Sequence, residues 1–151
     1  MKAFVLAIAV AASAAVAAQL PRQDAAGTIR ARQANYKQMA AAMKGIRDQL
    51  RASRPALPLI RRSSAVIAGH AVNVLRWFPR GTGPEAGVRT RALPQIWTDQ
   101  ASFTRRGAAL LVAARNLDAA ARAGDAARVR AALPAVASAC GACHDDFRAP
   151  E

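Results

Sequence analysis

Apolar side chains spaced seven residues apart recur in four stretches of this chain, and prolines and glycines separate the stretches. In the first stretch, one such row consists of Ile29, Tyr36, Met43 and Leu50. Seven-residue spacing brings side chains to one face of an α-helix and is typical of helices in left-handed bundles. No stretch shows a convincing alternation of the kind that indicates a β-strand. The sequence therefore predicts an all-α fold, an antiparallel up-down-up-down four-helix bundle.

The bounds of the four predicted helices follow from the residues between them. Pro55 and Pro58 precede the second helix, and Gly124 ends the third. The predicted ranges are about Asp24 to Arg51 with Asp24 as N-cap, about Leu59 to Phe78, about Gln95 to Ala123, and a last helix capped by Asp125. The residues from Pro79 to Pro94 are predicted to form a loop, which is long for a compact bundle.

The fourth helix carries Cys140, Cys143 and His144 in the pattern Cys-x-x-Cys-His, which is the attachment signature of c-type haem. Residues three and four apart are neighbours on a helix, so two thiols can bond to the porphyrin edge while the imidazole reaches the iron. The alternatives are a disulfide or half of a zinc site. Zinc needs a second pair of ligands, and the only other histidine, His70, has no partner near it in the sequence. The motif therefore predicts one covalent haem c.

The first eighteen residues have the pattern of a secretory signal peptide. Lys2 precedes an apolar run from Ala3 to Ala18, whose small residues allow cleavage after Ala17 or Ala18. The run is shorter than the ~20 residues of a membrane-spanning helix, so we expect no permanent membrane anchor. We therefore predict a signal peptide over residues 1–18 and a haem domain over residues 19–151. The expected location is periplasmic, because c-type haem is attached outside the reducing cytoplasm.

The chain is strongly basic, with 22 Lys and Arg against 9 Asp and Glu and a formal net charge of +13. Such a charge is typical of proteins that bind nucleic acid or anionic membranes. Here the arginines are scattered over every segment and no nucleic-acid motif accompanies them, so no nucleic-acid partner is expected. The charge favours an acidic redox partner instead. The inward rows carry neither paired carboxylates nor a nucleophile with a base, so the sequence predicts no enzyme.

Arg32 lies on an inward row of the first predicted helix, one turn before Tyr36. A buried charge is costly unless it is paired. The residues alone leave two interpretations open: the side chain reaches out to the surface, or it meets a buried anion such as a haem propionate. The loop from Pro79 to Pro94 is predicted to cover one edge of the cofactor, and His70 is predicted to be a surface residue.

Several segments of the chain carry a more specific pattern. They are Arg32–Met39, Phe78–Gly83, Ile96–Asp99 with Phe103, and Cys140–His144 with Phe147 and Arg148. In these segments the chain resembles cytochrome c′, the class II family of c-type cytochromes. The haem motif alone is shared by most c-type cytochromes, and its place at the C-terminal end makes the resemblance more specific. The resemblance implies an exported four-helix bundle.

The resemblance also assigns roles to individual residues. It implies that Cys140 and Cys143 carry the thioether bonds and that His144 is the proximal iron ligand. Arg32 is similar to the family arginine near a haem propionate, which favours the second interpretation above. Arg148 is similar to the arginine beside the proximal face.

Tyr36 falls where the family places a distal residue over the sixth coordination site. In the low-spin branch of the family, a methionine at about this place ligates the iron. Tyr36 implies instead a shielded site, with a neutral phenol and high-spin iron that binds nitric oxide and carbon monoxide; a phenolate that ligates ferric iron is the other possibility. The alternative function is a six-coordinate low-spin electron carrier, for which Met39 or Met43 would supply the ligand.

The high-spin branch of the family usually forms homodimers through the first two helices. The second predicted helix has apolar residues beyond its two inward rows: Val66, Val72, Leu75 and Trp77. Outside the core, these residues would form a second apolar strip that a monomer exposes to water, unless the following loop covers it. We therefore expect a homodimer.

Overall fold

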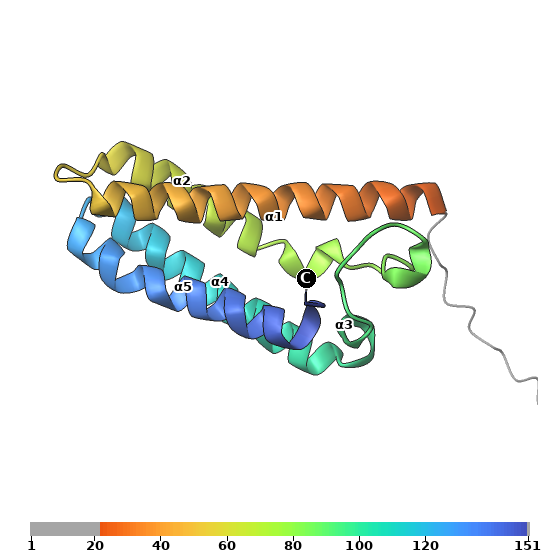
Figure 1. Cartoon of the computed structure of the whole chain (residues 1–151). Coiled ribbons are helices and arrows are strands. Elements are labelled where there is room, and N and C mark those ends of the chain that lie inside the picture. The colour runs from red at the N-terminus through yellow and green to blue at the C-terminus, as the bar shows by residue number, and fades with distance from the viewer. Residues whose placement is uncertain (1–21, 151) are drawn as a thin grey trace, which may run out of the picture.

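The computed structural model describes residues 22–150, and the predicted signal peptide over residues 1–18 lies outside them. Four long helices pack as an up-down-up-down bundle (Figure 1): α1 (Arg22–Arg51), α2 (Leu57–Ala71), α4 (Gln100–Arg122) and α5 (Ala126–Phe147). Three short helical segments lie between α2 and α4: η1 (Val74–Trp77), η2 (Pro84–Ala86) and α3 (Gln95–Thr98). The predicted all-α four-helix fold is confirmed. None of the described helices is long and apolar enough to cross a membrane.

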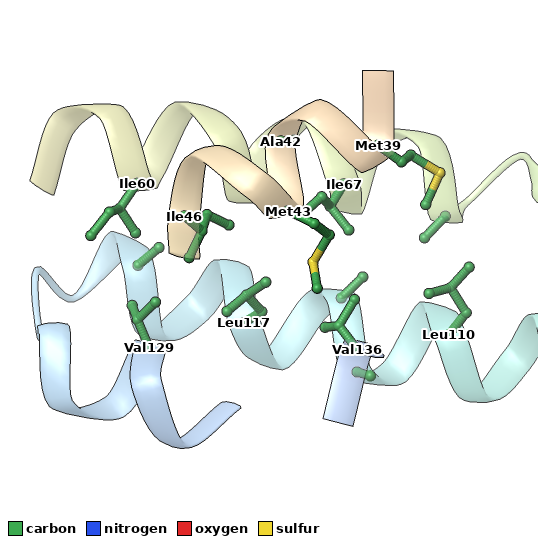
Figure 2. Close-up of a cluster of buried hydrophobic side chains, with 14 of the residues drawn as sticks. Met39, Ala42, Met43, Ile46, Ile60, Ile67, Leu110, Leu117, Val129 and Val136 are labelled. Carbon is green, nitrogen blue, oxygen red and sulfur yellow. The ribbon is translucent and has the colours of Figure 1, made fainter. Parts of the chain in front are cut away.

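The seven-residue rows meet in the centre of the bundle, as predicted. Side chains from all four long helices form one apolar cluster, here called the aliphatic core (Figure 2): Met39, Met43, Ile46, Ile60, Ile67, Leu110, Leu117, Val129 and Val136, with several alanines. Ile46, Ile67 and Leu117 are completely buried. Burying one such side chain contributes about 1.5–3 kcal/mol, so this core holds the helices together.

The second helix is shorter than predicted at its C-terminal end. α2 stops at Ala71, and the next turn is the 3₁₀ segment η1. Asn73 explains the break, because its side-chain Nδ2 donates a hydrogen bond to the Gly69 carbonyl at 3.3 Å, an acceptor that a continuing α-helix would offer to the Asn73 N–H. That N–H donates instead to the His70 carbonyl at 2.9 Å. The tighter turn starts there.

Three further predicted boundaries were wrong. Asp24 lies in the first turn of α1 rather than at its N-cap, and Pro58 lies inside the first turn of α2 rather than before it. Proline fits there because the first N–H groups of a helix have no intrahelical partner. The predicted third helix is divided into α3 and α4 at Asp99. Its carboxylate accepts a hydrogen bond from the Ser102 N–H at 3.0 Å and caps α4.

The turn between α4 and α5 is as predicted. Gly124 has a φ of 71°, a left-handed conformation that glycine adopts without steric cost at the end of a helix. The Asp125 carboxylate accepts hydrogen bonds from the N–H groups of Ala127 at 2.9 Å and Arg128 at 3.0 Å. These contacts cap α5 and fix the antiparallel pair of helices that carries the haem motif.

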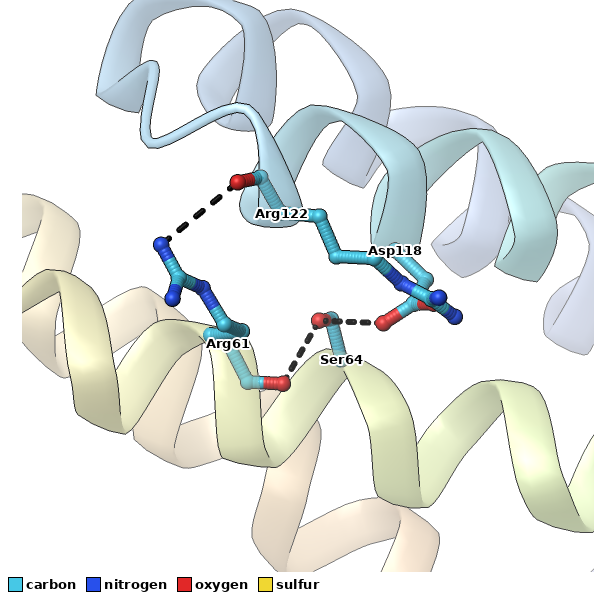
Figure 3. A network of polar contacts seen from close by, with 4 residues as sticks. All are labelled: Arg61, Ser64, Asp118 and Arg122. Atoms are coloured by element: carbon cyan, nitrogen blue, oxygen red, sulfur yellow. Dashed lines mark hydrogen bonds and ion pairs between the residues drawn. The ribbon is translucent and has the colours of Figure 1, made fainter.

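A buried acid links α2 to α4 beside the aliphatic core (Figure 3). Asp118 is 3% exposed, and Ser64 Oγ on α2 donates to one of its carboxylate oxygens at 3.0 Å. Arg122, one turn along α4, donates to the other oxygen from Nε at 2.7 Å. Arg61 on α2 donates to the Arg122 carbonyl at 3.5 Å. The carboxylate therefore has partners on both helices, and charge-assisted hydrogen bonds of this kind fix how α2 lies against α4.

Candidate functional site

All six Phe, Tyr and Trp side chains of residues 22–150 form one connected set of ring contacts, here called the aromatic cluster: Tyr36, Trp77, Phe78, Trp97, Phe103 and Phe147. Neighbouring ring centroids lie 5.2 to 6.5 Å apart. The rings come from α1, η1, α3, α4, α5 and the start of the loop. Aromatic pairs at these distances attract each other beyond their hydrophobic burial. The cluster therefore joins elements that are distant in sequence around the end of α5.

The two cysteines of the motif lie where the aliphatic core meets the aromatic cluster. Cys140 packs against the aliphatic core, and Cys143 packs against the group of Ile96, Phe103 and Phe147. Both thiols are half-buried, and neither forms a disulfide. Burial raises the pKa of the Cys143 thiol to about 11, with a further contribution from Cys140. The disulfide alternative is not seen in this structure. Because the pKa of each thiol is raised, both are protonated near neutral pH.

His144 follows directly and lies at the surface of α5. Arg148, one turn later, has its Nη1 3.3 Å from His144 Nδ1. Burial, then Arg148 and Arg91, lower the pKa of the imidazole. The neutral ring therefore dominates at neutral pH, and a metal ion binds that form. In residues 22–150, no group of three or more His, Cys, Asp and Glu side chains is arranged to hold a metal ion, so the zinc alternative has no further ligands there.

Tyr36 points from α1 into the aromatic cluster. Its ring lies 5.2 Å from the Trp77 ring at an interplanar angle of 88°, and 6.5 Å from the Phe78 ring. Burial is the main cause that raises the pKa of the phenol, Cys143 and Cys140 add to the rise, and Arg32 opposes it. The phenol is therefore neutral over the physiological range and lies within electrostatic range of the motif cysteines.

Arg32 is 3% exposed, so the interpretation in which its side chain reaches the surface was wrong. Its Nη1 donates to Thr82 Oγ1 at 2.9 Å, and its Nη2 donates to the Thr82 carbonyl at 2.7 Å and to Thr90 Oγ1 at 2.8 Å. The guanidinium also lies 4.6 Å from the centre of the Phe78 ring, within cation–π distance. Burial lowers the pKa of Arg32, but a guanidinium stays protonated in proteins. Arg32 thus holds the loop onto α1.

The same loop is bound at its other end to the C-terminal end of α5. The Leu93 N–H donates to the Phe147 carbonyl at 3.0 Å, and the Ala149 N–H donates to the Arg91 carbonyl at 2.8 Å. The Trp97 indole N–H donates to the carbonyls of Phe78 at 3.0 Å and Pro79 at 3.1 Å. The loop therefore runs from the Tyr36 side of the site to the side of His144, and its predicted covering of the cofactor stays a prediction.

Sequence reasoning missed part of this arrangement. Thr82 and Thr90 gave no signal, because loop threonines are common and their partner Arg32 is 50 and 58 residues away. His70 was predicted to be a surface residue. It is half-buried instead, with its ring 5.6 Å from the Trp77 ring and its Nε2 2.9 Å from Gln38 Oε1. Trp77 itself packs against Tyr36, so it is not part of an exposed apolar strip.

The residues at this site fit a covalent haem. Two thiols without a disulfide lie on one half-buried helix face, a neutral imidazole follows them, and aromatic rings pack against Cys143. Thiols, an imidazole and apolar walls are the groups that a c-type haem needs.

A family model described as Cytochrome C′ matches residues 27–148 of this chain. The chain belongs to the cytochrome c′ family. Among the relatives, the cytochrome c′ of Rhodopseudomonas palustris is 34% identical over 119 residues, which cover 78% of this chain and 79% of the relative. That of Alcaligenes xylosoxydans xylosoxydans is 42% identical over 77 residues, 51% of this chain. The match to this relative spans only 58% of its length.

Solved structures of cytochromes c′ have the same fold. The crystal structure from Thermochromatium tepidum has a TM-score of 0.77 and 31% identity, and the match covers 88% of this chain and 100% of that one. A ferrous variant from Alcaligenes xylosoxidans with bound nitric oxide has a TM-score of 0.73 and 28% identity, with 86% and 97% of the two chains covered. The cofactor of cytochrome c′ is a covalent c-type haem, so the predicted cofactor is confirmed.

Proposed function

We propose that this chain is an exported cytochrome c′ that binds nitric oxide and carbon monoxide at a five-coordinate, high-spin haem iron. The observation that carries the proposal is the Tyr36 phenol, which is half-buried against the aromatic cluster and whose pKa is raised, mainly by burial, so that it stays neutral. A neutral phenol is a poor iron ligand, so it shields a coordination site without occupying it. A relative of this family has been solved with bound nitric oxide, which supports a gas as the ligand.

The remaining site residues hold the cofactor. Cys140 and Cys143 form the thioether bonds, and His144 is the proximal ligand, with Arg148 beside its Nδ1. The bound haem supplies the iron that takes up a diatomic gas. The Arg32 guanidinium has five N–H donors. Three of them form hydrogen bonds to the loop, and the other two suit a haem propionate.

A six-coordinate electron carrier is supported less well. It requires Met39 or Met43 as the sixth ligand, and both side chains lie in the aliphatic core among residues of the other helices (Figure 2). A thioether that moved from there to the iron would leave a cavity in the core, which costs about 2–5 kcal/mol for the loss of a methionine side chain.

Exposed apolar residues and the net charge support proposals for the oligomeric state and the redox partner. Val66, Val72 and Leu75 are 36%, 52% and 38% exposed, which supports a homodimer that covers this face of α2 and η1. A related cytochrome c′, with a TM-score of 0.77 and 27% identity, is described as having a ligand-controlled dimer dissociation. If the protein also transfers electrons, the net charge of +13 favours an acidic partner.

Two measurements test the proposed function. The intact mass of the exported protein should equal the chain from residue 18 or 19 onwards plus one haem, and both thiols should resist alkylation. Tyr36→Ala should bind carbon monoxide faster and more tightly than the wild type, while the resting ferrous spectrum changes little. Tyr36→Phe is the matched control, because it keeps the shielding ring. An unmodified mass, or carbon monoxide binding that is equal in all three proteins, would contradict the proposal.

A further inference from the structure

Ring packing sets the direction of the Tyr36 side chain. Among residues 22–150, the ring contacts found for Tyr36 are those with Trp77 and Phe78. A tyrosine on a helix has more than one accessible χ1 rotamer. The rings that touch Tyr36 therefore decide whether its phenol stays on the side of the motif cysteines or turns away.

Trp77 makes the closest of these ring contacts. The centroids lie 5.2 Å apart and the planes are nearly perpendicular at 88°, which is the favoured edge-to-face arrangement. The Phe78 contact is longer, 6.5 Å, and tilted at 50°. Phe78 also contacts Trp97 and Phe103, so most of its ring contacts are with the rings of α3 and α4 rather than with Tyr36.

The Trp77 ring is in turn contacted by His70. The ring of His70, on α2, lies 5.6 Å from the Trp77 ring, and His70 Nε2 lies 2.9 Å from Gln38 Oε1 on α1. Gln38 is two residues after Tyr36, so these contacts start and end on the same turn of α1. They pass through η1, which exists because Asn73 ends α2 early.

The segment that carries Trp77 is also fixed against α4. A Cβ atom on Gly107 would lie only 2.5 Å from Leu75 Cδ2. The missing side chain of Gly107 leaves room for the Leu75 side chain where η1 contacts α4. Trp77 therefore sits on a segment anchored to α2, to α4 and to α1.

We propose that Trp77 is a positioning residue that holds the Tyr36 ring in its shielding orientation and thereby slows the entry of small gases to the iron. This inference rests on the proposed function of Tyr36. It adds that the rate of gas binding is set by a residue of η1 that need not touch the gas.

A double-mutant cycle with carbon monoxide as probe tests the inference. Trp77→Leu should raise the carbon monoxide association rate of the ferrous protein by about two- to tenfold, the scale that one aromatic pair sets. In the Tyr36→Ala background, the same substitution should leave the rate unchanged, because the ring through which Trp77 acts is gone. Trp77→Phe keeps an edge-to-face ring and should retain the wild-type rate.

A second readout follows the Tyr36 ring directly. Tyr36 is the only tyrosine of the chain, so a ring-labelled tyrosine gives a single set of NMR signals in the diamagnetic ferrous carbon monoxide form. Trp77→Leu should shift and broaden these signals, and Trp77→Phe should not. Arg76→Ala is the matched control, because it removes an exposed side chain from the same segment and leaves both the Leu75 packing and the ring contact in place.

The outcomes separate the two claims. Equal effects of Trp77→Leu in both Tyr36 backgrounds, or an equal effect of Arg76→Ala, would show that Trp77 does not act through Tyr36 and would overturn the inference alone. No carbon monoxide binding by the wild-type protein would overturn the proposed function and the inference together.

Discussion

The two clusters of the bundle are built from different residues and are held by different polar contacts. The aliphatic core consists of Ile, Leu, Val, Met and Ala, nearly all from the four long helices, with Val74 from η1. The aromatic cluster draws its rings from short segments and the loop as well. The aliphatic core is thus mainly the packing of long helices, whereas the site is assembled largely from parts that helix packing does not fix.

Each cluster has one buried charge beside it, and the two charges have different kinds of partner. Asp118 next to the aliphatic core is paired with the oppositely charged Arg122. Arg32 next to the aromatic cluster has only neutral oxygens of the loop as hydrogen-bond partners. Glu85 acts on the Arg32 guanidinium through its charge, and we propose a haem propionate as its further anion. We therefore propose that Asp118 serves stability and that Arg32 serves the site.

The largest effect is expected in the aliphatic core. Leu117→Ala should lower the free energy of unfolding by about 2–5 kcal/mol, because it leaves a cavity among fully buried side chains. Val112→Ala, on the same helix but 59% exposed, should change it by less than about 0.5 kcal/mol. Chemical denaturation measures both. If Leu117→Ala altered carbon monoxide binding while the protein stays folded, the two clusters would not be separate in function.

The next effect is expected at Arg32. Arg32→Met should cost about 1.5–3 kcal/mol, because Thr82 loses a charged hydrogen-bond donor in a buried place. Amide hydrogen exchange should become faster in residues 79–94 and stay slow in the aliphatic core. Arg30→Met, at an exposed position on the same helix, is the control. Uniformly faster exchange in both regions would mean that the loop and the core unfold as one unit.

A smaller effect is expected at the ion pair of Asp118. Arg122→Ala should cost about 1–3 kcal/mol, because the buried carboxylate keeps only the Ser64 hydroxyl as a partner. Arg115→Ala on the exposed face of α4 should have almost no effect. Carbon monoxide binding should be the same in both variants. A change in gas binding by Arg122→Ala would contradict the assignment of this pair to stability.

The smallest effect concerns Tyr36 at alkaline pH. The pKa of Tyr36 is raised by burial, so the folded state favours the neutral phenol. Its contribution to stability is complete below the unfolded pKa of about 10 and is lost as the pH rises above that value toward the folded pKa. Tyr36→Phe cannot ionise and should lose less stability than the wild type between neutral and alkaline pH. Equal losses in the two proteins would show that the phenol is not buried.

The helices could be predicted because their information is local. Rows such as Ile60, Ile67 and Val74 repeat within one segment, and all three are buried as expected. Helix ends were less predictable, because they depend on single side chains. Asn73 shortens α2 by taking the Gly69 carbonyl, and Asp99 divides the third helix.

The motif residues of the site could be predicted, but the contacts around them could not. The haem motif is a short contiguous pattern that favours one interpretation and contains Cys140, Cys143 and His144. The Arg32 contact with Thr82 joins residues 50 positions apart, and the Tyr36 contact with Trp77 also joins α1 to η1. Such pairs depend on where the loop and η1 come to lie, and no periodicity in the sequence encodes that.

The absorbance spectrum of the ferrous protein, before and after carbon monoxide is added, tests the central claim most directly. The account predicts a five-coordinate, high-spin ferrous spectrum with a broad visible band, which carbon monoxide converts completely to a six-coordinate form. Sharp, separate α and β bands before carbon monoxide is added would show that a side chain already occupies the sixth site. That result would contradict the shielding role of Tyr36 and favour an electron carrier.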